Sequence, residues 1–129
     1  LGMQLLASWG QEGATTPTGT PGLGLIPGHV TRLEPEEALS LPHVGWNAVT
    51  WDPSVVLGDG LPAGGDFYFV HSYAFHPERP EHSLAWSDYG QRFSAVVGAD
   101  NVLGVQFHPE KSQRLGRRLL TNFLSLGPC

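Results

Sequence analysis

The sequence predicts one α/β domain spanning residues 1–129, with a body of strands flanked by helices at both ends. Three observations support this class. The chain has 129 residues, which is enough for one compact domain with its own core and too short to expect two. Short β-branched and aromatic stretches separated by turn residues fill its middle. Apolar residues recur at helical spacing near both ends.

The first third of the chain is expected to hold a helix, a loop and two short strands. Apolar residues at helical spacing (Leu1, Leu5 and Trp9) predict a short buried helix over residues 1–9, ended by Gly10. Residues 10–22 are rich in Gly, Pro and Thr, which indicates a surface loop. Residues 22–35 alternate enough to predict two short strands that break at Pro27 and Gly28.

The rest of the chain predicts a run of strands and a closing helix. The expected strands cover residues 43–51, 66–75, 83–89, 91–99 and 101–107. The helix covers residues 112–126, with Ser112 as its N-cap and an apolar face made of Leu115, Leu119, Phe123 and Leu126.

Charge and cysteine content exclude several classes of protein. The formal net charge is −5 with only seven Lys and Arg residues, which argues against a general nucleic-acid binder. Four of these cations lie within residues 111–118 and predict a solvated helix face. The only cysteine is Cys129, so an internal disulfide framework is excluded and a reducing, cytoplasmic compartment is expected. No run of about 18 apolar residues exists, so we expect no membrane association.

The tetrapeptide FHPE occurs twice, at 75–78 and at 107–110. In each copy the proline forces the preceding histidine into an extended conformation. Residues i and i+2 of an extended chain point to the same side, about 6.6 Å apart. Glu78 can therefore reach His76, and Glu110 can reach His108. A carboxylate so placed orients an imidazole and steadies its protonated form, as in catalytic triads.

Context favours the second copy as the functional one. His108 and Glu110 follow an apolar strand and precede the closing helix, and in open α/β sheets ligands bind at the carboxyl ends of strands. The first copy is expected to lie in a flexible polar connection over residues 76–82, where a pair is poorly preorganised. The alternative for His108 is a structural histidine at the start of a helix.

The opening residues LGMQLL fit a second part of an active site. The first turn of a helix offers free N–H groups and a positive dipole end to a developing oxyanion. In a nucleophile elbow, the reactive residue would come immediately before Leu1. Gln4 on a buried helix would need hydrogen-bond partners for its amide.

Five stretches together resemble one family, and they are LGMQLL (1–6), GLGLIPG (22–28), LPHVGWNAV (41–49), FYFVHSY (67–73) and GVQFHPEKS (104–112). They resemble the glutamine amidotransferase subunits of imidazole glycerol phosphate synthase, which are class I (triad) amidotransferases of histidine biosynthesis. The resemblance extends to about residue 126. It implies the later part of a flavodoxin-like domain, with an open mixed sheet flanked by helices.

The resemblance also implies roles for individual residues. The family's nucleophilic cysteine would stand just before Leu1, with His108 as general base and acid and Glu110 orienting it. The residues implied to hold the glutamine substrate are Leu1, through its backbone N–H in the oxyanion hole, and Gln4, His71, Ser72 and Tyr73. Ammonia would pass to a (β/α)8 cyclase subunit in a heterodimer, with Trp46, Tyr68 and Lys111 at the interface. Neither a metal nor another cofactor is implied.

One departure leaves alternatives open. The family's early strands and its cysteine are absent from these 129 residues, and Cys129 follows the last helix, so it cannot replace the nucleophile. The chain is therefore expected to be the later part of a longer domain. Another triad amidotransferase, feeding anthranilate or guanylate synthesis, and a non-catalytic amidotransferase fragment remain possible. A metal-binding β-rich module is the third alternative, with ligands from His71, His76, Glu78 and His82. Without the resemblance, His71, Trp46 and Tyr68 would be read as packing residues.

Overall fold

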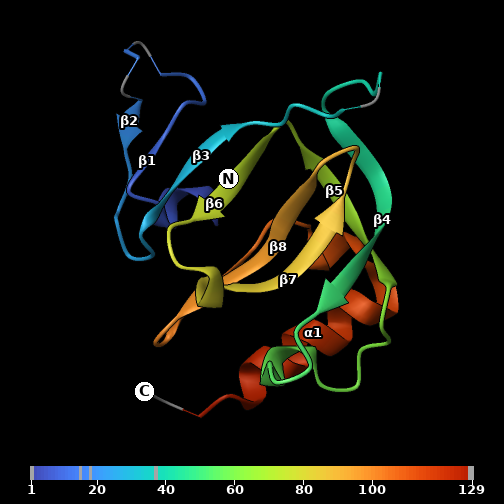
Figure 1. The fold of residues 1–129 in the computed structure, drawn as a ribbon. Helices are drawn as coiled ribbons and strands as arrows, with labels where there is room; N and C mark the ends of the chain where they lie inside the picture. Colours follow the sequence, from blue (N-terminus) through green and yellow to red (C-terminus); the bar gives the residue numbers. More distant parts are fainter. Residues whose placement is uncertain (1, 15, 18, 37, 128–129) are drawn as a thin grey trace.

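Two sheets and one α-helix make up the structure, a computed structural model that describes residues 2–14, 16–17, 19–36 and 38–127. The four-stranded sheet has the order β2-β1-β3-β6 and the five-stranded sheet the order β5-β4-β7-β8-β9 (Figure 1). The first sheet consists of β1 (Trp9–Gly10), β2 (Thr20–Pro21), β3 (Gly28–Arg32) and β6 (Tyr73–Pro77). The second consists of β4 (His43–Trp51), β5 (Gly65–His71), β7 (Ser83–Asp88), β8 (Arg92–Ala99) and β9 (Val102–Val105).

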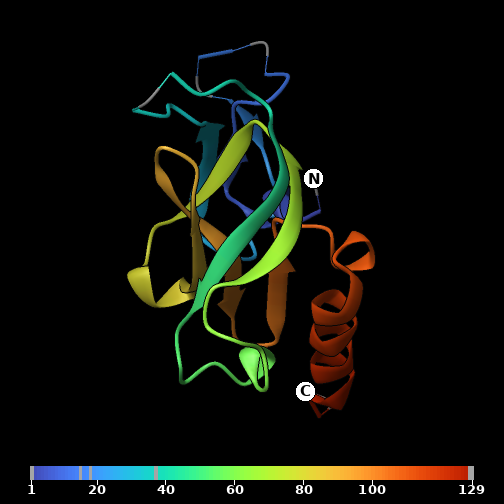
Figure 2. The ribbon, with the colours of Figure 1, turned by 90° about the vertical axis from the view of Figure 1, so that its right-hand side faces the viewer.

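Helices are few in the described part of the chain. The α-helix α1 (Gln113–Ser125) follows β9, and Figure 2 shows it standing beside the strands. The four short 3₁₀ turns are η1 (Gln4–Leu6), η2 (Val56–Gly58), η3 (Pro80–His82) and η4 (Pro109–Lys111). None of the helices within the described ranges has both the length and the apolar character needed to cross a membrane.

The core has two parts. The larger part is formed mainly by strands of the five-stranded sheet together with Leu119 of α1, and Ala74 of β6 also contributes to it. Aromatic rings dominate this part: the centroids of Phe67 and Phe107 are 4.2 Å apart, and Phe69 meets Phe93 edge to face. The smaller part lies against the four-stranded sheet and consists of Met3, Ala7, Ile26, Val30, Phe75 and Val97. Residues 102–107 therefore run between two apolar clusters, so the turn that follows them starts from a well-packed base.

The α/β class is confirmed, and so are most of the later elements. The strand expected over 43–51 is β4, those over 83–89 and 91–99 are β7 and β8, and the closing helix is α1. The strand expected over 66–75 is divided at Ser72, because β5 pairs with β4 in one sheet and β6 pairs with β3 in the other. The prediction of one continuous strand there was wrong.

The helix expected over residues 1–9 was also wrong for the described residues. Only η1 forms, and the chain then enters β1. The carbonyl oxygens of Leu5, Leu6 and Ala7 accept hydrogen bonds from the N–H groups of Leu23, Ile26 and Gly24. These bonds to a distant segment replace the bonds within a helix, so apolar spacing alone was misleading. Between residues 22 and 35 one strand, β3, forms in place of the two expected.

The first FHPE copy does not lie in a flexible connection, as was predicted. Phe75, His76 and Pro77 belong to β6, where His76 pairs with His29 and Pro77 with Gly28 of β3. Phe75 is fully buried, and the ring of His76 stacks on that of His29 with centroids 5.1 Å apart. Strand pairing and the buried phenylalanine outweigh the polar composition of the segment.

Candidate active site

The second FHPE copy forms the pair that the sequence predicted. Nδ1 of His108 lies 2.8 Å from Oε1 of Glu110. His108 has an extended backbone (φ −100°, ψ 97°) and comes directly before η4. With Nδ1–H donating to the carboxylate, Nε2 of the ring is left to exchange a proton with a reacting group. Desolvation alone would raise the pKa of Glu110, but its own backbone N–H and the His108 ring hold that pKa below its usual range.

The turn that carries this pair is fastened to β5. The N–H of His108 donates to the carbonyl of Tyr68 over 2.9 Å. The Ser112 hydroxyl donates to the His108 carbonyl over 2.7 Å and accepts from the N–H of Tyr68 over 3.0 Å. Ser112 occupies the predicted N-cap position of α1, but its side chain makes no capping bond. It instead links the turn to the sheet, and at 2 % exposure it is shielded from water.

Gln4 ties the opening segment to the strands around this turn. Its Nε2 donates to the carbonyl of Tyr73 over 3.3 Å and to Oε1 of Gln106 over 3.2 Å. Gln106 lies two residues before His108. The NH₂ group of the half-buried Gln4 thus has both of its hydrogen-bond partners, one from β6 and one from the chain that leads into the turn carrying His108.

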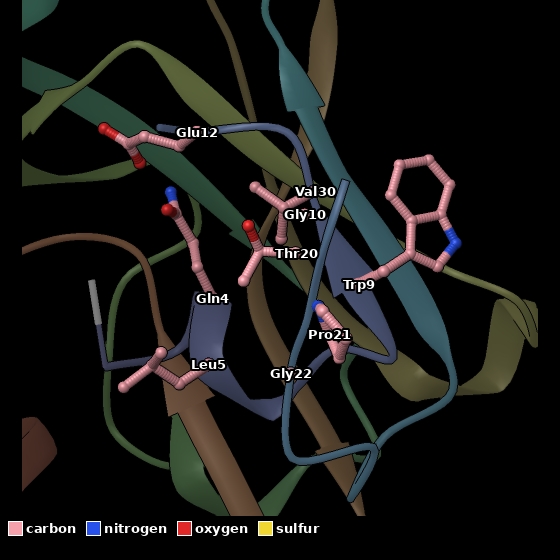
Figure 3. A pocket seen from close by; sticks show the side chains of 9 residues that line it. All are labelled: Gln4, Leu5, Trp9, Gly10, Glu12, Thr20, Pro21, Gly22 and Val30. Atoms are coloured by element: carbon pink, nitrogen blue, oxygen red, sulfur yellow. The ribbon is translucent and has the colours of Figure 1, made fainter. Parts of the chain in front are cut away.

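A pocket opens beside Gln4, as Figure 3 shows. It is lined by Gln4, Leu5, Trp9, Gly10, Glu12, Thr20, Pro21, Gly22 and Val30. The side chains of Gln4 and Glu12 lie at one end of it in this view, whereas the Trp9 ring points away. Sequence reasoning did not single out Glu12, because a lone carboxylate in a glycine-rich loop carries no signal until the fold brings it to the same pocket as Gln4.

His71 and Tyr73 lie at the junction of β5 and β6, next to Gln4. His71 is 7 % exposed, and both of its ring nitrogens are engaged: Nδ1 lies 2.8 Å from the Tyr73 carbonyl and Nε2 lies 2.9 Å from Nδ1 of His43. Ser72 uses its carbonyl to accept from the N–H of Leu33. The ring of His71 is thus a buried structural group, and its link to Gln4 runs through the Tyr73 carbonyl.

Leu1, the remaining residue predicted to hold substrate, lies outside the described residues. Its role in an oxyanion hole therefore stays a prediction.

Burial controls the protonation of the imidazole rings of His43 and His71. Desolvation, reinforced by the neighbouring His71, lowers the pKa of His43 from 6.5 to about 4, and desolvation also lowers the pKa of His71. Both rings are accordingly neutral at pH 7.

The lowered pKa of His43 predicts a pH dependence of stability. The unfolded chain, with its histidine pKa near 6.5, binds more protons than the folded chain, so the free energy of unfolding falls as the pH drops from 6.5 towards 4. We expect the urea midpoint to decrease over this window, and the decrease to be smaller in His43→Phe. An equal decrease in both proteins, followed by tryptophan fluorescence, would show that His43 does not carry the effect.

The predicted interface residues Trp46, Tyr68 and Lys111 come together on the outer face of the β4–β5 hairpin. Trp46 pairs with Tyr68 across the strands, with ring centroids 5.8 Å apart, and Nζ of Lys111 lies 5.8 Å from the Tyr68 ring centroid. Trp46 is 49 % exposed. Val44 and Val70 are also exposed and share this face by strand alternation, which sequence reasoning did not use.

The structure gives no support to the metal-binding alternative. His71 is hydrogen-bonded to His43 in the five-stranded sheet, whereas His76 stacks on His29 in the four-stranded sheet, so these two proposed ligands belong to different sheets. Among the side chains of residues 2–14, 16–17, 19–36 and 38–127, no three of the His, Cys, Asp and Glu type converge on a point that could hold a metal ion.

The fold and the paired histidine and glutamate agree with the comparison to known families. Residues 1–126 match the family described as "Glutamine amidotransferase class-I", and the chain belongs to this family. The predicted membership is confirmed.

Curated relatives narrow the likeness to one branch. The chain is 52% identical over 132 residues to "Imidazole glycerol phosphate synthase subunit HisH 1" of Prochlorococcus marinus, covering 100% of this chain and 61% of the relative. It is 46% identical over 129 residues to the HisH subunit of Ruegeria pomeroyi, covering 99% and 59%. Against the HisH subunit of Azospirillum brasilense it is 49% identical over 125 residues, covering 96% and 63%. The chain thus spans about three fifths of the length of these relatives.

Proposed function

We propose that this chain is the later part of the glutamine amidotransferase subunit of an imidazole glycerol phosphate synthase. In this proposal the subunit hydrolyses glutamine and passes ammonia to a (β/α)8 cyclase partner in histidine biosynthesis, in the cytoplasm. The observation that carries the proposal is the His108–Glu110 pair, joined over 2.8 Å in a turn fastened to β5, within a chain that belongs to the class I family. The identities to HisH subunits support the branch.

The proposed chemistry uses Nε2 of His108, for which no hydrogen-bond partner exists among the residues that the structure describes. A cysteine placed just before Leu1 would lose its proton to Nε2, and its sulfur would then attack the side-chain amide carbon of glutamine. The carbon–nitrogen bond breaks as His108 returns the proton to the leaving ammonia. Water, deprotonated by the same ring, then cleaves the thioester and releases glutamate. Glu110 stabilises the imidazolium in both steps, because it accepts the Nδ1–H bond.

We assign the pocket beside Gln4 to the amino-acid end of the substrate. The Glu12 carboxylate complements the α-ammonium group of glutamine, and Gln4 adds a neutral polar group at the same end of the pocket. Ser72, Tyr73 and the N–H of Leu1 keep the predicted substrate-holding roles. His71 acts through the Tyr73 carbonyl, since its own ring nitrogens are occupied.

The function is tested by producing the protein together with the residues that precede Leu1 in its gene. We expect this longer protein, mixed with the cyclase, to release glutamate from glutamine, and the 129-residue chain to release none. If the residue before Leu1 is not cysteine and the longer protein hydrolyses no glutamine, the proposed chemistry is refuted. The protein would then be a binding subunit without glutaminase activity. Hydrolysis by the 129-residue chain alone would refute the placement of the nucleophile.

The interface assignment predicts that Trp46→Ala weakens binding to the cyclase. Trp46 is large and about half exposed, beside Tyr68 and Lys111, so it has the character of a binding hot spot. Truncation of such a residue costs about 2 kcal/mol, or roughly a 30-fold rise in Kd.

The matched control is Val56→Ala, which removes an exposed apolar side chain in η2, in the connection between β4 and β5. Titration calorimetry with the cyclase measures both variants. Equal Kd values for wild type and Trp46→Ala would place the interface elsewhere.

A further inference from the structure

An unbroken row of hydrogen bonds runs through two buried imidazoles that the proposed chemistry does not use. Nδ2 of Asn47 lies 2.7 Å from the carbonyl of Asp88 and 3.2 Å from Nε2 of His43. Nδ1 of His43 lies 2.9 Å from Nε2 of His71, and Nδ1 of His71 lies 2.8 Å from the carbonyl of Tyr73. His43 and His71 are 3 % and 7 % exposed. Such a row is expensive to bury unless every member is satisfied.

The two ends of the row fix its direction. The carbonyl oxygens of Asp88 and Tyr73 can only accept, so Nδ2 of Asn47 and Nδ1 of His71 must donate. A neutral His71 then accepts at Nε2, which requires His43 to donate from Nδ1 and to accept from Asn47 at Nε2. One pair of tautomers, Nδ1–H on both rings, satisfies all four bonds. Burial supports this neutral state by lowering the pKa of both rings.

The row continues into the pocket through Gln4. The Tyr73 carbonyl that accepts from His71 also accepts from Nε2 of Gln4, and the second donor of that amide is used by Oε1 of Gln106. Because the Tyr73 carbonyl can only accept, a flip of the Gln4 side chain that exchanged Nε2 and Oε1 would lose the hydrogen bond to this carbonyl. Within the described part of the chain, Oε1 of Gln4 has no hydrogen-bond partner, and Gln4 lines the pocket together with Glu12.

We propose that His43 is a positioning residue for ligand binding. Its Nδ1–H bond to His71 keeps the Nδ1–H of His71 directed at the Tyr73 carbonyl and so holds that carbonyl within reach of Nε2 of Gln4. The Gln4 amide is thereby fixed with Oε1, an acceptor, towards the pocket. Two acceptors, Oε1 of Gln4 and the Glu12 carboxylate, then stand at one end and select a ligand with a primary ammonium group over an anion. The inference rests on the proposed function only in taking this ligand to be glutamine.

The row itself is tested by NMR on the ¹⁵N-labelled 129-residue chain at pH 7. Long-range imidazole spectra should show both rings as neutral Nδ1–H tautomers, with a coupling across the hydrogen bond from His43 Nδ1 to His71 Nε2. The Gln4 side-chain NH₂ should exchange slowly in the wild type and faster in His43→Phe, which keeps the ring stacking on Tyr89 and Phe69. An Nε2–H tautomer on either ring, or a Gln4 amide indifferent to His43→Phe, would overturn the proposal.

The consequence for binding is tested by glutamine kinetics on the longer protein with its cyclase. His43→Phe is expected to raise KM for glutamine about tenfold and to change kcat by less than about twofold, because positioning acts on binding. The control His76→Phe alters a half-buried histidine of β6 that lies outside the row and should leave both constants unchanged.

An unchanged KM in a folded His43→Phe protein would contradict the positioning role. If the wild-type longer protein hydrolyses no glutamine, the proposed function fails. The NMR experiment then decides by itself whether the hydrogen bonds from His43 through His71 hold the Gln4 amide.

Discussion

His108→Ala is expected to lower the rate of glutamine hydrolysis by the longer protein about 10³-fold or more. His108 would supply both proton transfers of the proposed reaction, and general acid–base catalysis typically contributes 10²- to 10⁴-fold. The histidine of the other FHPE copy cannot replace it, since His76 lies in β6 and stacks on His29. Glu110→Gln keeps a hydrogen-bond partner for the ring but removes the charge, so we expect a smaller loss of about 10²-fold.

Steady-state release of glutamate, with the cyclase present, measures these effects. The matched control is His76→Ala, which alters the histidine of the other FHPE copy and should leave the rate within about twofold of wild type. A His108→Ala protein that is folded and retains more than a tenth of the rate would remove His108 from the catalytic role. Equal losses in His76→Ala and His108→Ala would show that the two copies had been distinguished wrongly.

Gly116→Ala is expected to lower the free energy of unfolding by about 3 kcal/mol, although replacing glycine by alanine within a helix usually raises it. In an exposed helix interior, alanine is favoured over glycine by about 1 kcal/mol. Here a Cβ on Gly116 would overlap the carbonyl oxygen of Pro109 and lie 3.0 Å from Cβ of Ser112. The helix must therefore move away from η4, and overpacking of this kind typically costs 1–3 kcal/mol in addition to strain in the turn. Because His108 and Glu110 flank Pro109, their geometry should loosen too.

Urea unfolding of the 129-residue chain measures this effect. The control is Gly127→Ala, where a new Cβ meets nothing within 4 Å, so its midpoint should stay close to that of wild type. A Gly116→Ala chain as stable as the wild type would mean that α1 does not pack on η4 as closely as the structure indicates.

The elements that sequence alone predicted are those governed by local rules. The strand β4 and the helix α1 follow from local periodicity, and Val49 and Leu119 are buried in the core. The apolar face predicted for α1 is confirmed only in part, because Phe123 is 50 % exposed. The His108–Glu110 pair follows from an extended histidine before proline, which depends on neighbouring residues alone. Such features need no knowledge of the rest of the fold.

The missed features depend on contacts between distant segments. The opening residues form η1 in place of a helix because the loop around Gly24 takes their carbonyl groups. His76 lies in β6 because β3 pairs with that segment. The pocket beside Gln4 and Glu12, like the bond between His43 and His71, joins stretches that the sequence keeps apart. Local pattern carries no information about such pairings.

The most direct test of the central claim is to find the site at which a glutamine diazoketone alkylates the longer protein. Such an analogue occupies a glutamine site and reacts covalently with an activated thiolate. Peptide mass spectrometry should then place the adduct on a cysteine immediately before Leu1, and labelling should slow in the His108→Ala variant. An adduct on Cys129, or labelling at an unchanged rate without His108, would contradict the account.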